Sequence, residues 1–284
     1  MICSFGPVRY DFSSRTYIMG IVNVTPDSFS DGGRWSDPES AVRHGLRLAE
    51  EGADILDIGG ESSRPGAEPV GADEELRRVL PVIRELARRC PIPISIDTTK
   101  AAVADAALGA GAVIVNDISA LRGDPLMAPT AARHGAAVVL MHMKGTPRTM
   151  QEAPVYGDLI GELCFFFEEA IASAQRAGLE RLILDPGLGF GKTAEHNFEI
   201  LRSLGRFRRF GFPLLVGPSR KSFLGSVLGT GPEDRMEGTA AAVAAAVMNG
   251  AQIVRVHDVR AMKRVVQVAD AIARPALQAA GSGT

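Results

Sequence analysis

The sequence has too few cysteines for a disulfide framework or a cysteine-based metal site. Its 284 residues include only Cys3, Cys90 and Cys164, and their spacing matches neither a zinc motif nor a disulfide scaffold. Isolated thiols of this kind are typical of a reducing compartment, where buried or unreactive cysteines are common. We therefore expect a cytoplasmic protein.

Strong charge of either sign and long apolar runs are also missing. The formal net charge is -2, and the densest basic stretches, 88–89 and 206–209, lie near expected helix ends, where a solvated surface is the usual interpretation. No apolar run reaches the roughly 20 residues that a membrane-spanning helix needs. We expect a soluble protein that binds neither nucleic acid nor a membrane.

The sequence does contain a regular alternation of short apolar strands and helices. Because 46% of the residues are apolar, the chain can bury a large core. Strands are expected at 17–23, 55–58, 94–97, 113–117, 138–142, 182–185, 214–217 and 253–257, each followed by a helix. Eight such units in a chain of this length favour an α/β fold, a parallel (β/α)8 TIM barrel, over a doubly wound open sheet.

The rest of the chain adds little to this barrel. Residues 1–16 are expected to form a short N-terminal edge strand or hairpin, because residues 8–12 alternate and Ser13-Ser14 can turn. A single barrel would then occupy residues 17–275, with a sixth helix near 195–207, and residues 276–284 are expected to be disordered. The loop at 144–158 is long, and long loops are often functional.

Polar side chains gather at the carboxyl ends of the expected strands. In barrels of this type those ends meet at one mouth, where catalytic groups lie. Side chains two residues apart share one face of a strand, so these groups can converge inside the barrel. The set is Asn23, Asp57, Asp97, Asn116, His142, Asp185, Gly217, Lys221, Arg255 and His257. Two interpretations stay open for Asp57, ligand contact or bracing of a loop, and two for His142, ligand contact or filling of the barrel.

Hydroxyls and cations are concentrated in the loop after the second strand and on the last strand. They are Ser62, Ser63, Arg64, Arg255 and His257. Guanidinium forks and loop N–H groups of this kind bind phosphates well. This part of the mouth therefore suits a diphosphate.

Carboxylates and an amide lie on the middle strands, where Asp97, Asn116 and Asp185 suit the edge of a flat heterocycle with alternating donors and acceptors. Burying these groups for packing alone would be costly. Asn23 offers a single neutral oxygen, which fits a magnesium ion that takes most of its ligands from water and diphosphate.

Eight ordered stretches resemble those of the dihydropteroate synthases, pterin-binding enzymes of the folate pathway. They are GIVNVTPDSFSDGG at 20–33, DIGGESSRPG at 57–66, ISIDT at 94–98, NDIS at 116–119, MHMKGTP at 141–147, LDPGLGF at 184–190, SRKSF at 219–223 and RVHDV at 255–259. The resemblance covers essentially residues 17–272. It implies that 7,8-dihydropterin-6-ylmethyl diphosphate and 4-aminobenzoate condense to 7,8-dihydropteroate and diphosphate.

The resemblance also implies a pterin pocket. Asp97, Asn116 and Asp185 would hold the pterin edge, and Lys221 would lie on its oxo side. Side chains that line this pocket would be Met141 and Phe190.

Roles for the other motif residues follow from the same resemblance. Asn23 would meet magnesium, and Ser63, Arg255 and His257 would hold the diphosphate. The residues that frame the 4-aminobenzoate site would be Arg64, Pro65 and Ser222. The groups expected to act in catalysis are Asp97, Lys221, Arg255 and His257.

Ser63 stands where the family often has threonine, which keeps the hydroxyl but removes a methyl group from the loop. No insertion follows Arg64, so we expect sulfonamides to compete with 4-aminobenzoate. The family is usually homodimeric through helices of the outer ring. Two other functions stay open, a corrinoid-linked pterin methyltransferase and a catalytically silent pterin-binding paralogue.

Overall fold

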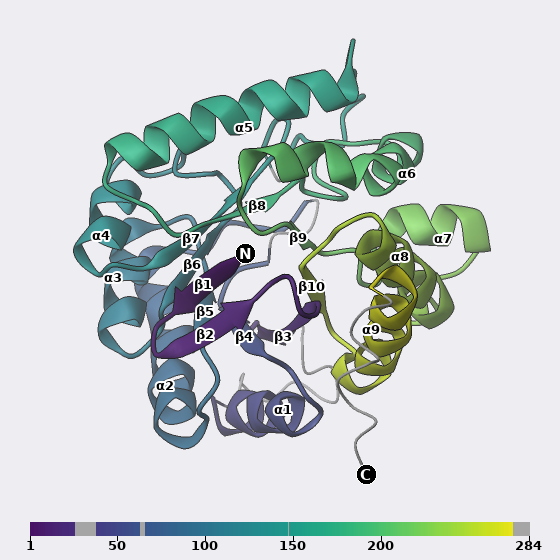
Figure 1. The fold of residues 1–284 in the computed structure, drawn as a ribbon. Helices are drawn as coiled ribbons and strands as arrows, with labels where there is room; N and C mark the ends of the chain where they lie inside the picture. The colour runs from purple at the N-terminus through teal and green to yellow at the C-terminus, as the bar shows by residue number, and fades with distance from the viewer. Residues whose placement is uncertain (26–37, 63–65, 147, 275–284) are drawn as a thin grey trace.

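Eight parallel strands form a barrel surrounded by helices, as the sequence predicts (Figure 1). The structure is a computed structural model that describes residues 1–25, 38–62, 66–146 and 148–274. The barrel strands are β3 (Tyr17–Asn23), β4 (Ile55–Gly59), β5 (Ile94–Asp97), β6 (Ile114–Asp117), β7 (Ala137–Met141), β8 (Leu182–Asp185), β9 (Leu215–Val216) and β10 (Ile253–Val256).

The strand ladder closes on itself. The order β8-β7-β6-β5-β4-β3-β10-β9 leaves β8 and β9 at its ends, and a parallel bridge between Leu184 and Leu214 joins them. The Leu184 N–H also donates to the carbonyl of Pro213 at 2.9 Å. This closure excludes the doubly wound open sheet.

Helices follow the strands and form the outer layer (Figure 1). They are α1 (Pro38–Glu50), α2 (Ala72–Arg89), α3 (Ala101–Gly109), α4 (Met127–Arg133), α5 (Leu159–Arg176), α6 (Ala194–Ser203), α7 (Ser222–Leu228), α8 (Met236–Met248) and α9 (Val259–Ala273). The helix expected near 195–207 is in fact α6 followed by the 3-10 helix η2 (Leu204–Phe210). Gly211 ends it in a left-handed conformation, φ +75°, which glycine adopts at little cost.

The N-terminal residues form a hairpin, β1 (Ile2–Phe5) and β2 (Val8–Asp11), that is a sheet of its own. The hairpin turns at Gly6-Pro7, with Gly6 at φ +55°. The turn expected at Ser13-Ser14 also forms, but it leads out of β2 and is not the turn of the hairpin. Phe5 and Tyr10 are buried against inward-facing side chains of the barrel strands. In Figure 1 the hairpin crosses the centre of the ring. It therefore covers the end of the barrel where the strands begin.

No helix in the described ranges combines the length and the apolar character needed to span a membrane. The proposed disordered tail, 276–284, lies outside the described residues.

Candidate active site

Arg255 links three strands at the carboxyl end of the barrel. Its Nε donates to Asp57 Oδ2 at 2.6 Å and its Nη2 donates to Asp97 Oδ2 at 2.8 Å. Asn116 Nδ2 donates to the same Asp57 oxygen at 3.0 Å. Side chains from β10, β4, β5 and β6 are thereby joined in one network at the mouth. Within the described part of the chain, Arg255 Nη1 makes no hydrogen bond, so it can meet a ligand.

Asp57 is the centre of this network. It is fully buried, 0% exposed, and it holds both Arg255 and Asn116. A buried carboxylate needs such partners. The structure therefore supports a bracing role for Asp57, but it braces two neighbouring side chains rather than a loop.

The pKa of the Asp97 carboxyl group is unusually high. Burial raises its pKa to about 7, and the nearby charges of Asp57 and Glu75 act in the same direction. The positive charge of Arg255 opposes them. Asp97 is therefore close to half-ionised at neutral pH, and it becomes mostly protonated below that pH and mostly ionised above it.

Lys221 and Asp185 carry opposite charges that interact at the carboxyl end of the barrel. Burial lowers the pKa of Lys221 to about 8, while the charges of Asp185 and Asp97 oppose the shift. Its Nζ donates to the carbonyl of Leu188 and lies 4.5 Å from the centre of the Phe190 ring. Burial raises the pKa of Asp185, although Lys221 opposes that shift. A cation, a carboxylate and an aromatic face thus share one wall.

His257 follows β10 and is tied to the loop after β9. Its Nδ1 lies 2.9 Å from Ser219 Oγ, and its backbone N–H donates to the same oxygen at 3.2 Å. Gly217 is buried next to Arg255, since a β-carbon there would lie 3.7 Å from Arg255 Cβ. Ser222 is exposed at the start of α7.

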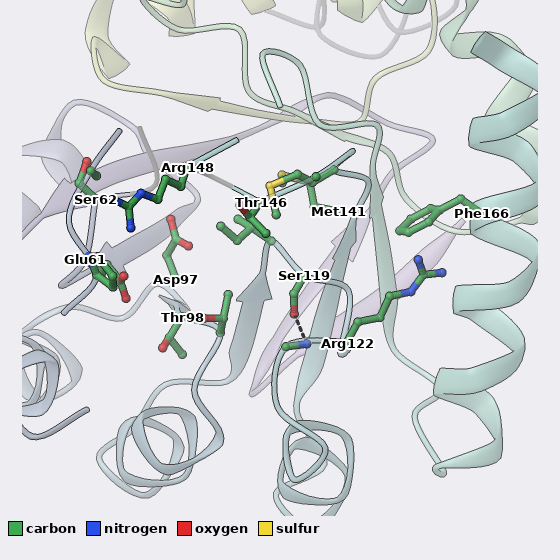
Figure 2. Close-up of a pocket in the computed structure, with 17 residues that line it drawn as sticks. Glu61, Ser62, Asp97, Thr98, Ser119, Arg122, Met141, Thr146, Arg148 and Phe166 are labelled. Carbon is green, nitrogen blue, oxygen red and sulfur yellow. Dashed lines mark hydrogen bonds between the residues drawn. The ribbon is translucent and has the colours of Figure 1, made fainter. Parts of the chain in front are cut away.

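A cavity of about 520 Å³ opens beside this network. Among the predicted residues, Ser62, Asp97 and Met141 line it. Figure 2 shows Ser62 on one side, Arg122 on the other and Asp97 between them. The predicted groups Asn116, Asp185, Lys221 and Arg255 are not part of its lining, although Arg255 is hydrogen-bonded to Asp97, which is. Of the described predicted residues, the structure joins Asp97, Asn116 and Arg255 through Asp57 beside this cavity. Lys221 and Asp185 interact electrostatically with that network.

Three predicted residues, Ser63, Arg64 and Pro65, lie outside the described residues. Asn23 is half-buried at the end of β3, in register with Gly59. Across the described ranges, no three His, Cys, Asp or Glu side chains are grouped so that they could hold a metal ion. The side-chain oxygen of Asn23 is the donor that the sequence predicts for magnesium, and a single oxygen suits an ion with mostly non-protein ligands.

Lys192 was not among the residues that the sequence predicted for the site. It is buried after β8, and its Nζ lies 2.9 Å from His142 Nδ1 and 2.9 Å from the carbonyl of Phe190. His142 also packs edge-on against Phe166, with ring centres 4.8 Å apart. Burial lowers the pKa of His142 far below its usual range. His142 therefore packs between the end of β7 and α5, which neither of the two interpretations described, and Lys192 fixes the loop that carries Phe190.

Lys100 was not predicted from the sequence either, and it anchors the loop after β4. Lys100 donates to Glu61 in that loop and to Glu75 Oε2 of α2, the latter at 2.6 Å. Glu75 is fully buried. The sequence did hold a signal, because Glu75 lies four and eight residues before Val79 and Ile83, on the buried face of the helix.

Comparison with known proteins gives a consistent result. The pattern of the pterin binding enzyme family matches residues 19–257. The dihydropteroate synthase of Synechocystis sp. is 51% identical over 272 residues, 95% of this chain and 94% of that protein.

Solved structures agree with this match. The crystal structure of the Yersinia pestis dihydropteroate synthase in complex with a sulfonamide drug superposes with a TM-score of 0.91 at 44% identity, covering 96% of this chain and 99% of that one. A dihydropteroate synthase from Xanthomonas albilineans in complex with 7,8-dihydropteroate gives a TM-score of 0.87 at 44% identity, with the same shares covered.

Proposed function

The chain belongs to the family of pterin-binding enzymes, and we propose that its mouth residues carry out the dihydropteroate synthase reaction as follows. The enzyme is a transferase that condenses 7,8-dihydropterin-6-ylmethyl diphosphate with 4-aminobenzoate, giving 7,8-dihydropteroate and diphosphate. The observation that supports the assignment of roles most strongly is the pairing of Arg255 with both Asp57 and Asp97. It places a cation for the diphosphate beside a carboxylate for the ring.

The pterin ring is bound by its polar edge. Asp97, Asn116 and Asp185 take the ring N–H and amino groups, and Lys221 donates to the oxo group. Met141 and Phe190 contact its faces; the position of Phe190 under the Lys221 ammonium supports this arrangement. An analogue without the matching donors would leave buried acceptors unpaired, so the site selects against it.

The diphosphate is held on the other side of the ring. Arg255 binds it through Nη1, and Ser62, Ser63 and His257 add hydrogen bonds. The 4-aminobenzoate lies between the diphosphate and the start of α7, framed by Arg64, Pro65 and Ser222. The exposure of Ser222 beside the half-buried Lys221 supports a site that is open to the second substrate.

Diphosphate leaves first. The bond between the methylene carbon and the diphosphate oxygen breaks with its electron pair on the oxygen, and the electron-rich ring delocalises the positive charge. The Asp97 carboxylate stabilises that cation while Arg255 stabilises the departing anion. The neutral aniline nitrogen then attacks the methylene carbon and releases one proton, so no strong base is required.

Magnesium fits Asn23, because one neutral oxygen at the mouth suits an ion that draws its other ligands from water and diphosphate. When bound, it would neutralise charge on the leaving group.

Product formation tests both the proposed reaction and its need for magnesium. The purified chain, given pterin diphosphate, labelled 4-aminobenzoate and magnesium, should make dihydropteroate, and chelation with EDTA should stop it. A pterin methyltransferase or a silent paralogue would give no labelled product.

The pH dependence of kcat/KM should be bell-shaped. Asp97 acts ionised, so activity rises as pH passes its pKa of about 7. Lys221 acts protonated, so activity falls as pH passes its pKa of about 8. Rates from pH 5.5 to 9.5 check this, and Lys221→Arg should lose the alkaline limb because arginine stays protonated. A flat profile over that interval would refute it.

Sulfonamides should inhibit competitively with 4-aminobenzoate, because no insertion follows Arg64 to alter the loop. We expect the KM for 4-aminobenzoate to rise linearly with sulfonamide concentration while kcat stays constant. Steady-state rates at several sulfonamide concentrations measure this. An unchanged rate at saturating sulfonamide would rule the prediction out.

We also infer a cytoplasmic homodimer. Three free cysteines support a reducing compartment. Exposed apolar side chains on the C-terminal helices, Met248, Val268 and Ile272, support pairing through the outer ring. Sedimentation of the purified chain at micromolar concentration tests the dimer.

A further inference from the structure

Arg220 has a strained backbone in the loop that follows β9 at the carboxyl end of the barrel. It lies between Ser219 and Lys221 with φ +57°, a left-handed conformation that brings the β-carbon of a non-glycine residue close to its own carbonyl. Such a conformation persists only where the surroundings hold it, and it is often found at functional sites.

Both backbone polar groups of Arg220 are held from the direction of α8. Its N–H donates to Thr239 Oγ1 at 3.1 Å, and its carbonyl accepts from Arg235 Nη1 at 3.0 Å. Thr239 is buried in α8. The Arg235 guanidinium passes so close to Gly225 that a β-carbon there would lie 2.5 Å from its nitrogens. Because Gly225 has no side chain, the Arg235 guanidinium fits in this space.

The Arg220 side chain points to the neighbouring loop. Its Nε and Nη2 donate to the two carboxylate oxygens of Asp258 at 3.0 and 2.7 Å. Asp258 directly follows His257, and His257 is itself bound to Ser219. Two adjacent residues of the β9 loop are therefore joined to two adjacent residues of the β10 loop.

We propose that Arg220 is a positioning residue that holds Lys221 and His257 in register for the condensation, an inference that rests on the proposed function. Its guanidinium is committed to Asp258, so it acts through its neighbours and not on the substrate. A bidentate fork fixes both distance and orientation, which a lysine ammonium cannot do.

Arg220→Lys keeps the charge and loses the fork. We expect kcat to fall 10- to 100-fold while the KM for pterin diphosphate and the melting temperature change little. The alkaline limb of the kcat/KM profile should also move, because Lys221 would sit in a different environment. A merely structural residue would lower activity only in proportion to the unfolded fraction and would leave this limb in place.

Two further variants keep the proposal testable if the first folds poorly. Arg220→Gly relieves the backbone strain, so we expect a folded protein with turnover at least tenfold lower. Asp258→Asn should reproduce the loss seen in Arg220→Lys, and the double variant should be no worse than the poorer single variant by more than twofold.

The matched control is Arg209→Lys, since Arg209 pairs with Glu168 at 2.6 Å on the outer ring. It should keep kcat within twofold of the parent protein. The proposal fails if Arg220→Lys and Arg220→Gly both keep kcat within threefold, or if the losses at Arg220 and Asp258 simply multiply. A parent protein that forms no dihydropteroate would instead overturn the proposed function.

Discussion

Replacement of Arg255 by methionine is expected to lower kcat/KM by roughly a thousandfold or more and to destabilise the fold by about 3–5 kcal/mol. The stability loss follows from burial, because Asp57 is 0% exposed and would lose the guanidinium that pairs with it. The activity loss follows from removal of the cation that receives the diphosphate. Steady-state kinetics and chemical denaturation measure the two effects separately.

A second substitution separates these effects. Combining Arg255→Met with Asp57→Asn removes the buried carboxyl group that has lost its guanidinium, so stability should largely return while turnover stays low. Arg15→Met is the matched control. Arg15 pairs with Asp54 at a distance of 2.6 Å, and this pair is not part of the network around Arg255. It should leave turnover unchanged. Recovery of turnover in the double variant would show that Arg255 matters only for the fold.

Asp97→Asn is expected to reduce kcat by roughly 10²- to 10³-fold, because the carboxylate that faces the developing cation loses its charge. Asparagine keeps the size of the side chain and can still accept a hydrogen bond from Arg255. The inhibition constant of diphosphate, measured as a competitive product inhibitor, should therefore change less than about threefold.

The control for this variant is Asp105→Asn, which alters an exposed carboxylate paired with Arg133 and His134 on the outer helices. It should behave like the parent protein. Equal losses in turnover and in diphosphate affinity for Asp97→Asn would contradict the role of the carboxylate in stabilising the cation.

Most of the barrel was predictable because each strand is an apolar run that ends in a polar residue. β3, β5 and β8 have the predicted bounds. β9 is shorter than predicted, since Pro218 has no N–H and cannot continue the ladder, and Leu214 makes only the closing bridge. The alternation at 8–12 and the turn at Ser13-Ser14 did not indicate which turn joins the hairpin strands, which is Gly6-Pro7, a two-residue turn that begins with a glycine.

The location of the site was predictable, but the contacts between its side chains were not. Period-two alternation placed Asp97 and Arg255 inside the barrel. It could not show that Arg255 contacts Asp57, 198 residues away in sequence, because that contact depends on how the strands close. Lys192 was missed for the same reason, since its partners lie directly after another strand, β7, and in its own loop.

The central claim is that side chains from Asn23 to His257 form one site for a pterin ring and its diphosphate. A crystal structure with a non-hydrolysable pterin diphosphate tests it most directly. We expect the ring edge within hydrogen-bond distance of Asp97, Asn116 and Asp185, with the diphosphate on Arg255. A ligand bound only between Arg122 and Arg148 in the cavity, with Asp185 and Arg255 untouched, would contradict the account.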